Sequence, residues 1–400
     1  GVESHGMMAS ERELELSEEH DGIIELPSGE VGERFVDWLA QNRPGAVDPM
    51  IYIKITPNRP DALGVRGIAR DLAARGLGTL KPLSVEPVKG GFDSPITVTL
   101  ADDVKDKACP HFVGRYIRGV KNGPSPVWLQ ERLKAIGLRP ISALVDITNL
   151  FTFDLNRPLH VFDADKVHGN ITARQAREGE ALLALDGKTY ALGPGITVIA
   201  DDQAPEALGG VMGGEVSGVT EDTVNVFVES AWFDPITTAA TGRRLKIHSD
   251  ARYRFERGID PAFTRDGMEL ATKLILDLCG GEASNIVEAG APALSDRAYR
   301  FDPKKVVSLV GMDIAEGDQR ATLEALGFTL KGDMATPPSW RPDVLGEADL
   351  VEEVARIASL TKLEGKPMRR AKPGVPKPIL TPIQMREKAA RRTLAALGYN

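Results

Sequence analysis

The sequence has little cysteine and no long apolar run. Cys109 and Cys279 are the only cysteines among 400 residues, which excludes a paired-cysteine zinc site and a disulfide framework. We therefore expect a reducing, cytoplasmic compartment. No stretch approaches the ~18 consecutive apolar residues of a membrane span, and no basic-then-apolar signal opens the chain. A soluble protein with no membrane partner is the expectation.

Positive charge is also in short supply. The chain has 49 Lys and Arg against 57 Asp and Glu, a formal charge of -8, which argues against a mainly basic nucleic-acid binder, although a local basic patch fits within that balance. The hydrophobic share of 42% and charged share of 26% are ordinary for a globular chain with a real core. At roughly 150 residues per domain, the length predicts two or three domains.

The usual signatures of stand-alone enzymes are missing. Gly187-Lys188-Thr189 resembles the end of a phosphate-binding loop, but Leu182 stands where that loop requires glycine. The glycine cluster at 209–214 lacks the G-x-G-x-x-G spacing of a dinucleotide site. There is no H-E-x-x-H and no G-x-S-x-G, so zinc-protease and serine-hydrolase chemistry are not indicated.

The element pattern mixes strands and helices without strict alternation, which predicts a multidomain α+β fold. The chain starts without Met and stops inside a helical pattern, so we expect a fragment of a longer protein. Apolar spacing, turn residues and glycine stops lead to a list of expected elements. Strands are expected at 22–27, 51–55, 96–100 and 112–117, helices at 32–42, 63–76, 126–136, 261–278, 318–326 and 348–360, and turns at 184–189 and 209–214.

A proline-rich linker follows the last of these helices. Residues 362–392 carry ten Lys or Arg against Glu364 and Glu387. A solvated linker and an RNA-facing strip are both open interpretations of this basic surplus.

Several ordered motifs match one family. They are TPNRPD at 56–61, VRGIARDL at 65–72, VDITN at 145–149, RPLHVFD at 157–163, GVMGGE at 210–215, VESAWFDP at 228–235, SDARYRFERG at 249–258 and PSWRPD at 338–343. With these motifs the chain closely resembles the bacterial phenylalanine–tRNA ligase β subunits, essentially from end to end.

The resemblance implies a domain order. Residues 1–43 are similar to the end of an OB-type tRNA-binding domain, 44–95 to a connecting B1-like domain and 96–285 to a B3/B4 editing domain. Residues 297–366 are similar to a small helix-rich, winged-helix-like B5 domain, and 367–400 to a linker and the start of a catalytic-like core module. In that family the α subunit activates phenylalanine with ATP and charges tRNA(Phe) in an α2β2 heterotetramer. We therefore expect no aminoacylation residues here.

Chemistry supports an editing role for Glu229. Phenylalanine and tyrosine differ by one hydroxyl, and an apolar pocket rejects such an isostere by only ~10²-fold. A second site whose buried carboxyl hydrogen-bonds the phenol selects in the opposite direction, because phenylalanine leaves that carboxyl unpaired. Glu229 stands in an otherwise apolar strand and matches the family's tyrosine-reading position. From the residues alone, a solvent-facing Glu229 is the alternative.

The resemblance assigns further residues to the same pocket. His160 is expected to line it, Arg139 and Asn149 to position the terminal adenosine and a water, and Gly213 and Ala251 to leave room for the aromatic ring. From the residues alone, a core histidine, a turn-forming asparagine and tight packing are the alternatives. Ser249 replaces a common threonine, and Leu150 a common aromatic residue, so the shape of the pocket is open. With no nucleophile–base pair in sight, hydrolysis by an oriented water, helped or not by a ribose hydroxyl, is the expected mechanism.

An acidic cluster follows in the third unit. Asp349, Glu352 and Glu353 lie at i, i+3 and i+4 of a helix, with Asp343 in the turn before it. Hard oxygen ligands suit Mg²⁺, and all four residues fall on the family's Mg²⁺ pattern, a site shared with the α subunit. Complementing the helix dipole is the alternative role.

Three functions compete. The first is a ligase β subunit that binds tRNA, assembles with the α subunit and edits Tyr-tRNA(Phe). The second is a free-standing deacylase of Tyr-tRNA, which needs neither a B5-like module nor a core start. The third is a non-enzymatic nucleic-acid scaffold, which the -8 charge disfavours.

Overall fold

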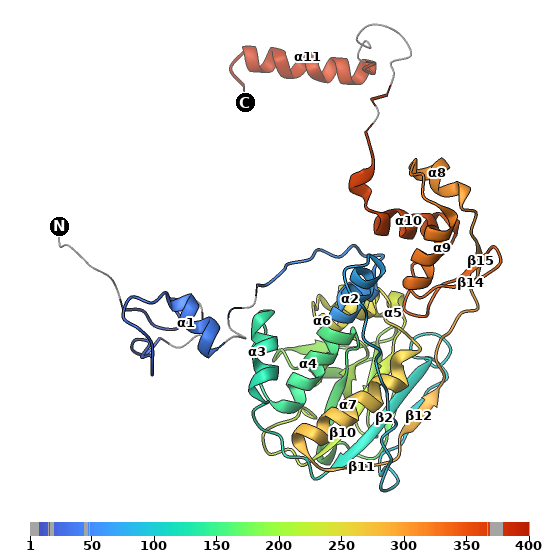
Figure 1. The fold of residues 1–400 in the computed structure, drawn as a ribbon. Coiled ribbons are helices and arrows are strands. Elements are labelled where there is room, and N and C mark those ends of the chain that lie inside the picture. Colours follow the sequence, from blue (N-terminus) through green and yellow to red (C-terminus); the bar gives the residue numbers. More distant parts are fainter. Residues whose placement is uncertain are drawn as a thin grey trace. The chain divides into compact units, whose positions relative to one another are not determined.

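The computed structural model describes residues 8–14, 16, 20–43, 47, 49–365, 367–368 and 379–399. The chain divides into two compact units, Gly1–Ser359 and Leu360–Asn400. Figure 1 shows the helices and strands of both units.

The first hundred residues contain short helices and much coil. Helix α1 (Phe35–Asn42) confirms the expectation at 32–42 and buries Trp38 and Leu39. The strands expected at 22–27 and 51–55 are wrong, because these segments are coil. Ile51 and Tyr52 are 79% and 88% exposed, since no neighbouring strand pairs with them. A 3-10 turn η2 (Pro60–Leu63) and helix α2 (Val65–Ala74) replace the single helix expected at 63–76.

A sheet buried on both faces forms the centre of the first unit. Its strand order is β11 (Glu282–Ala283), β2 (His111–Arg118), β10 (Asn225–Trp232) and β3 (His160–Asp163), and β12 (Val287–Gly290) also pairs with β2. Helices α3 (Val127–Ala135), α4 (Ala143–Leu155) and α7 (Phe263–Cys279) cover one face (Figure 1). Their apolar side chains pack against Val226 and Val228 of β10.

A second sheet covers the opposite face. Its order is β1 (Val98–Leu100), β4 (Ile171–Gln175), β7 (Thr197–Ala200), β8 (Pro205–Leu208) and β9 (Met212–Gly213). The core between the two sheets contains Phe112, Phe162, Phe227 and Ala231. Side chains alternate along a strand, so β10 sends 226 and 228 to the helices and 227 and 231 to the second sheet.

Other expected elements are confirmed within a few residues. The strand at 112–117, the helices at 126–136 and 261–278, and the Asp-Gly hairpin at 184–189, flanked by β5 (Ala181–Leu183) and β6 (Thr189–Ala191), are present. The sequence pattern missed α4, 3-10 turn η3 (Ala164–Lys166), α5 (Pro235–Leu245) and α6 (Asp250–Phe255).

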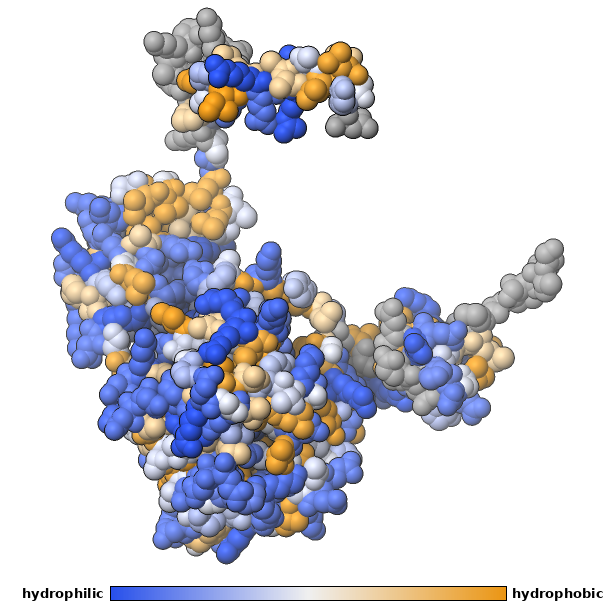
Figure 2. Space-filling model, turned by 180° about the vertical axis from the view of Figure 1, so that it is seen from behind, coloured by the Kyte–Doolittle hydropathy of each residue, from blue (hydrophilic) through white to orange (hydrophobic). Residues whose placement is uncertain are grey.

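A small module completes the first unit. It combines β13 (Tyr299–Arg300), β14 (Thr329–Lys331) and β15 (Met334–Thr336) with α8 (Lys304–Val310), α9 (Glu316–Ala325) and α10 (Glu347–Ala358). The helices at 318–326 and 348–360 are confirmed, whereas the three short strands were not expected. Hydrophobic residues are exposed over α8, where Val307 and Leu309 are 46% and 60% exposed (Figure 2).

The second unit contains 3-10 turn η4 (Leu360–Lys362) and helix α11 (Pro382–Ala396). Thr381 and Gln384 form a capping box at the start of α11. Much of the expected linker, and the cations at 366, 369, 370, 372 and 377, lie outside the described residues. Over the part of the chain that is described, no helix is long and apolar enough to cross a membrane.

Gly67 provides a test of how α2 is held. A Cβ at Gly67 would lie 1.8 Å from the carbonyl oxygen of Asp61, so the backbone must shift to accept any side chain. We expect Gly67→Ala to lower the free energy of unfolding by about 1–3 kcal/mol, measured by urea denaturation. Gly317→Ala in α9, where a Cβ meets no atom within 4 Å, is the matched control. Equal midpoints for both variants would contradict the close approach.

Candidate functional site

Glu229 lies in the middle of β10 and points into the core between the sheets. Its register partners are Gly114 on β2 and His160 on β3. The residue is 7% exposed, and its Oε2 atom has no hydrogen-bond partner among the described residues. Burial raises the pKa of Glu229 to about 8, because a low-dielectric interior disfavours the charged form. The predicted solvent-facing alternative is therefore wrong.

His160 faces the same space from β3. Its ring lies edge-on to Phe162 with 4.3 Å between ring centroids. The Nε2 atom is buried and has no partner within the described part of the chain. Burial lowers the pKa of His160 to about 4, so the imidazole is neutral at physiological pH. A neutral imidazole can donate from one nitrogen and accept at the other.

Small residues complete this group on the side of the second sheet. A Cβ at Gly213 would lie 2.2 Å from Cε1 of His160, so only glycine allows β9 to come this close. The Ser249 hydroxyl donates to the Val211 carbonyl at 2.5 Å and also caps α6. Ala251 packs against the core between the sheets. The structure thus brings His160, Gly213 and Glu229 together, and the place of Ser249 and Ala251 in the same pocket stays a prediction.

Arg139 and Asn149 do not join the group. Arg139 is exposed in the loop after α3, and Asn149 is part-buried on α4. Helix α4 packs on the face of the sheet opposite to Glu229. Leu150 packs with the same helical core, so this departure from the family pattern leaves the surroundings of Glu229 unchanged.

Sequence reasoning missed two neighbours of Glu229. Gly114 lies directly opposite, and a Cβ there would lie 2.2 Å from the Phe227 ring. The Cys109 thiol is fully buried; burial first, and then the Glu229 carboxylate, raise its pKa. No local motif marks either position; strand pairing brings Gly114 to Glu229, and Cys109 precedes the same strand.

The acidic cluster has a different arrangement from the one predicted. Arg341 binds Asp343 through two hydrogen bonds of 2.8 Å and also donates to Glu353. Arg356 donates to both oxygens of Glu353, at 2.7 and 2.5 Å. Burial by itself would raise the pKa of Glu353, but the hydrogen bonds from Arg356 and Arg341 outweigh it and lower the pKa to about 2.

The same arginines reach residues near α2. Arg356 binds Asp71 at 2.7 and 3.1 Å, and Arg341 lies 3.9 Å from Asp61. Arg59 binds both of these aspartates. An ionic network therefore joins the small module to η2 and α2. We call it the arginine network, and its members are Arg59, Asp61, Asp71, Arg341, Asp343, Glu353 and Arg356.

The predicted Mg²⁺ ligands do not fit a metal in this arrangement. Glu353 turns inward to two guanidinium groups, Glu352 turns outward to solvent, and Asp349 accepts from the Leu345 amide. Across the described ranges no group of three or more His, Cys, Asp or Glu could hold a metal ion. Asp343, Asp349, Glu352 and Glu353 therefore form no metal site by themselves within the described residues, and a site completed by an α subunit stays a prediction.

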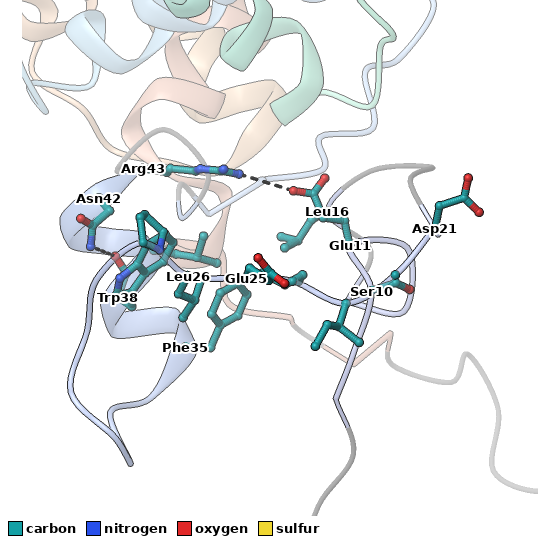
Figure 3. A pocket seen from close by; sticks show the side chains of 15 residues that line it. Ser10, Glu11, Leu16, Asp21, Glu25, Leu26, Phe35, Trp38, Asn42 and Arg43 are labelled. Carbon is teal, nitrogen blue, oxygen red and sulfur yellow. Dashed lines mark hydrogen bonds and ion pairs between the residues drawn. The ribbon is translucent and has the colours of Figure 1, made fainter.

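The cavities described next lie away from Glu229. One, of about 410 Å³, is lined by residues 10–43; Leu16, Leu26, Phe35 and Trp38 contribute apolar surface, and Arg43 pairs with Glu11 at 3.7 Å (Figure 3). The other, of about 320 Å³, is lined by Arg70, Trp340 and Asp260 among others. Neither contains a predicted site residue.

Comparison with known proteins gives two family matches. A family described as the B3/4 domain matches residues 108–280, and one described as the tRNA synthetase B5 domain matches 299–359. A protein of Cereibacter sphaeroides named phenylalanine–tRNA ligase beta subunit is 69% identical over 401 residues, covering 100% of this chain and 49% of that protein. Its namesake from Ruegeria pomeroyi is 67% identical over 400 residues, covering 100% and 50%.

A solved structure shows a weaker likeness. It is an N-terminal fragment of the phenylalanyl-tRNA synthetase β subunit from Pyrococcus horikoshii, 17% identical, with a TM-score of 0.38 over 76% of this chain and 84% of that one.

The unpaired carboxyl of Glu229 predicts a pH effect on stability. Its pKa of about 8 in the folded chain exceeds that of an unfolded glutamate, about 4.3, so the folded state binds the proton more tightly. The resulting stabilisation is complete below that unfolded value and is lost as the pH rises through about 8. We expect Glu229→Gln to remove this loss in urea denaturation between pH 5 and pH 9, roughly the range that spans both values. Glu215→Gln, an exposed control nearby, should retain it, and identical pH profiles for all three proteins would contradict the assignment.

The arginine network predicts insensitivity to metal. Arg341→Leu leaves Glu353 buried without one of its two partners, so we expect a loss of about 3–5 kcal/mol in the free energy of unfolding, partly recovered by adding Glu353→Gln. Mg²⁺ titration should not move the thermal midpoint of the wild-type chain. A clear upward shift that Glu353→Gln abolishes would restore the metal interpretation.

Proposed function

This chain belongs to the family of phenylalanine–tRNA ligase β subunits, and from that membership we propose that it carries a hydrolytic editing site that removes tyrosine from mischarged tRNA(Phe). The chain spans about half the length of the curated relatives it matches. The activity proposed here is therefore that of the B3/4 region, and it contributes to the ligase without performing aminoacylation.

One observation carries the proposal: Glu229 is a buried carboxyl without a hydrogen-bond partner among the described residues, on a strand between two layers of core. A phenol hydroxyl supplies the missing hydrogen bond, whereas the phenyl ring of phenylalanine leaves the carboxyl unpaired and desolvated. A site of this kind strongly prefers tyrosine over phenylalanine. An apolar aminoacylation site cannot exclude tyrosine to the same degree.

The neighbouring residues define the rest of the proposed pocket. The small side chain of Ala251 leaves space for the aromatic ring, whereas the His160 ring occupies the space beside Gly213. Ser249 fixes the wall through its bond to the Val211 carbonyl. His160, beside Glu229 in register, faces the ester. Arg139 and Asn149 lie away from Glu229 in this structure, so they are left out of the proposed pocket.

The chemistry favours an oriented water as the nucleophile. The pKa of His160, about 4, leaves it neutral but a weak base at pH 7, so its role is to hydrogen-bond the water and orient it. Cys109 is an unsuitable nucleophile, because its thiol is fully buried and its raised pKa keeps it protonated. A ribose hydroxyl of the terminal adenosine can assist the proton transfer.

The wider assembly is also part of the proposal. A cytoplasmic α2β2 heterotetramer would use ATP on the α subunit and bind tRNA(Phe) on both. Residues 1–43 would be the end of an OB-type domain, 44–95 a B1-like domain, 96–285 the editing domain, 297–366 a winged-helix-like B5 domain and 367–400 the linker and core start. Editing as proposed uses no Mg²⁺ at the acidic residues of α10, where Arg341 and Arg356 bind Glu353.

Deacylation tests the editing site directly. Tyr-tRNA(Phe) and Phe-tRNA(Phe) are incubated with the chain, and release of the amino acid is followed. We expect faster release of tyrosine, and a loss of this preference by roughly 10- to 100-fold in Glu229→Ala, the effect of one lost buried hydrogen bond of about 1.5–3 kcal/mol.

Glu215→Ala is the matched control and should behave as wild type. Equal release of the two amino acids by the wild-type chain, or an unchanged preference in Glu229→Ala, means that Glu229 does not read the hydroxyl. Retention of activity by the chain without an α subunit would favour a free-standing deacylase over a role confined to the assembled ligase.

A further inference from the structure

The turn between α5 and α6 presents two cations and one histidine to solvent. Arg243 lies in the last turn of α5, Lys246 adopts a left-handed conformation (φ 57°) just beyond it, and His248 follows. All three are exposed, whereas the intervening Ile247 is 2% exposed. We call Arg243, Lys246 and His248 the basic turn.

The basic turn is continuous with the wall of the Glu229 site. Ser249, the next residue, donates to the carbonyl of Val211, two residues before Gly213, which lies against His160. Ala251, two residues further on, packs in the core that contains Glu229's neighbours. Backbone that lines the site therefore leads directly into the turn.

The turn is held in place from both sides. Ile247 packs in a buried cluster with Val211 and Leu208. Arg252, 7% exposed, donates to the Ile247 carbonyl and to Glu256 at 2.9 Å. A turn fixed in this way presents its cations without a large loss of conformational entropy on binding.

Neighbouring charges do not neutralise the basic turn. Glu256 pairs with Arg252 and Arg257, and Asp250 pairs with Arg254 at 3.2 Å. Arg244 donates to the Pro194 carbonyl at 2.8 Å. Arg243, Lys246 and His248 have no ion pair within the described ranges.

We propose that the basic turn binds the phosphates of the single-stranded 3′ end of tRNA and guides it to the Glu229 site. The inference rests on the proposed editing function and deepens it by naming the approach of the substrate. Phosphate contacts from Lys and Arg position a nucleic acid without reading its sequence. Such contacts suit the 3′ end of tRNA, which must enter the site whether it carries tyrosine or phenylalanine. Complementing the dipole at the C-terminus of α5 is the competing role for Arg243 and Lys246.

The test is a double charge reversal, Arg243→Glu/Lys246→Glu, in the 400-residue chain. Its matched control is Lys121→Glu/Lys134→Glu, which makes the same change of charge at two exposed residues; Lys134 lies on α3, on the opposite face of the sheet. Two measurements are made: steady-state deacylation of Tyr-tRNA(Phe), and fluorescence-anisotropy binding of uncharged tRNA(Phe) at several salt concentrations.

For Arg243→Glu/Lys246→Glu we expect KM to rise by about 10-fold with kcat unchanged, and the slope of log affinity against log salt to fall in magnitude by about 1 to 1.5, since each phosphate contact to a single strand contributes ~0.7. Arg243→Gln/Lys246→Gln should give an intermediate effect. Removal of the terminal CCA from tRNA should abolish the difference between wild type and the double variant.

Two results overturn the proposal: an unchanged KM and salt slope in the double variant, or an equal loss in the control, which would be a bulk charge effect. Failure of the editing function gives a separate signature. If the wild-type chain releases no tyrosine, only the anisotropy measurement tests the proposal. A loss of tRNA affinity in the double variant that depends on the terminal CCA then still supports phosphate binding by the basic turn.

Discussion

Burial of β10 on both faces is the constraint on which the rest of the structure depends. Helices α4 and α7 cover one face and the second sheet covers the other, so every side chain in the middle of the strand is buried. The strand has eight residues. The two at its ends are half-buried, five of the six buried residues between them are apolar or small, and the sixth is Glu229. A carboxylate there would cost several kcal/mol without a partner, and the fold accommodates it by favouring the protonated acid. The geometry thus creates a group that gains from any ligand able to complete its hydrogen bonds.

Glu353 shows the opposite solution to the same problem. It is 1% exposed, yet its two oxygens accept hydrogen bonds from two arginines. Arg341 lies outside helix α10, and Arg356 lies one turn further along the same helix. The arginine network extends these bonds to Asp61 and Asp71 and so ties the small module to α2. Breaking one member leaves an uncompensated buried charge, which is why such networks fix geometry even where they add little net stability.

The sequence predicted the elements whose signals are local. Helix α7 has an apolar face and a glycine stop, and the β5–β6 hairpin has its Asp-Gly turn. It failed where formation depends on distant partners: 51–55 has the composition of a strand but nothing to pair with, while β13, β14 and β15 are too short to show a period. Helix α4 is apolar on most sides because it is buried among α2, α3 and α7, so it lacks the one-sided pattern of a surface helix.

The site shows the same division between local and distant information. Spacing correctly placed Asp349, Glu352 and Glu353 on one helix, but only the fold reveals that Glu353 faces Arg341 and Glu352 faces solvent. Likewise, no spacing rule brings His160 to Glu229, because their pairing depends on the register of β3 against β10. A buried acid in a sequence is therefore ambiguous until its partners are known. Where two guanidinium groups from different segments bind it, it holds the fold; where the described residues supply no partner, as at Glu229, burial favours the protonated acid.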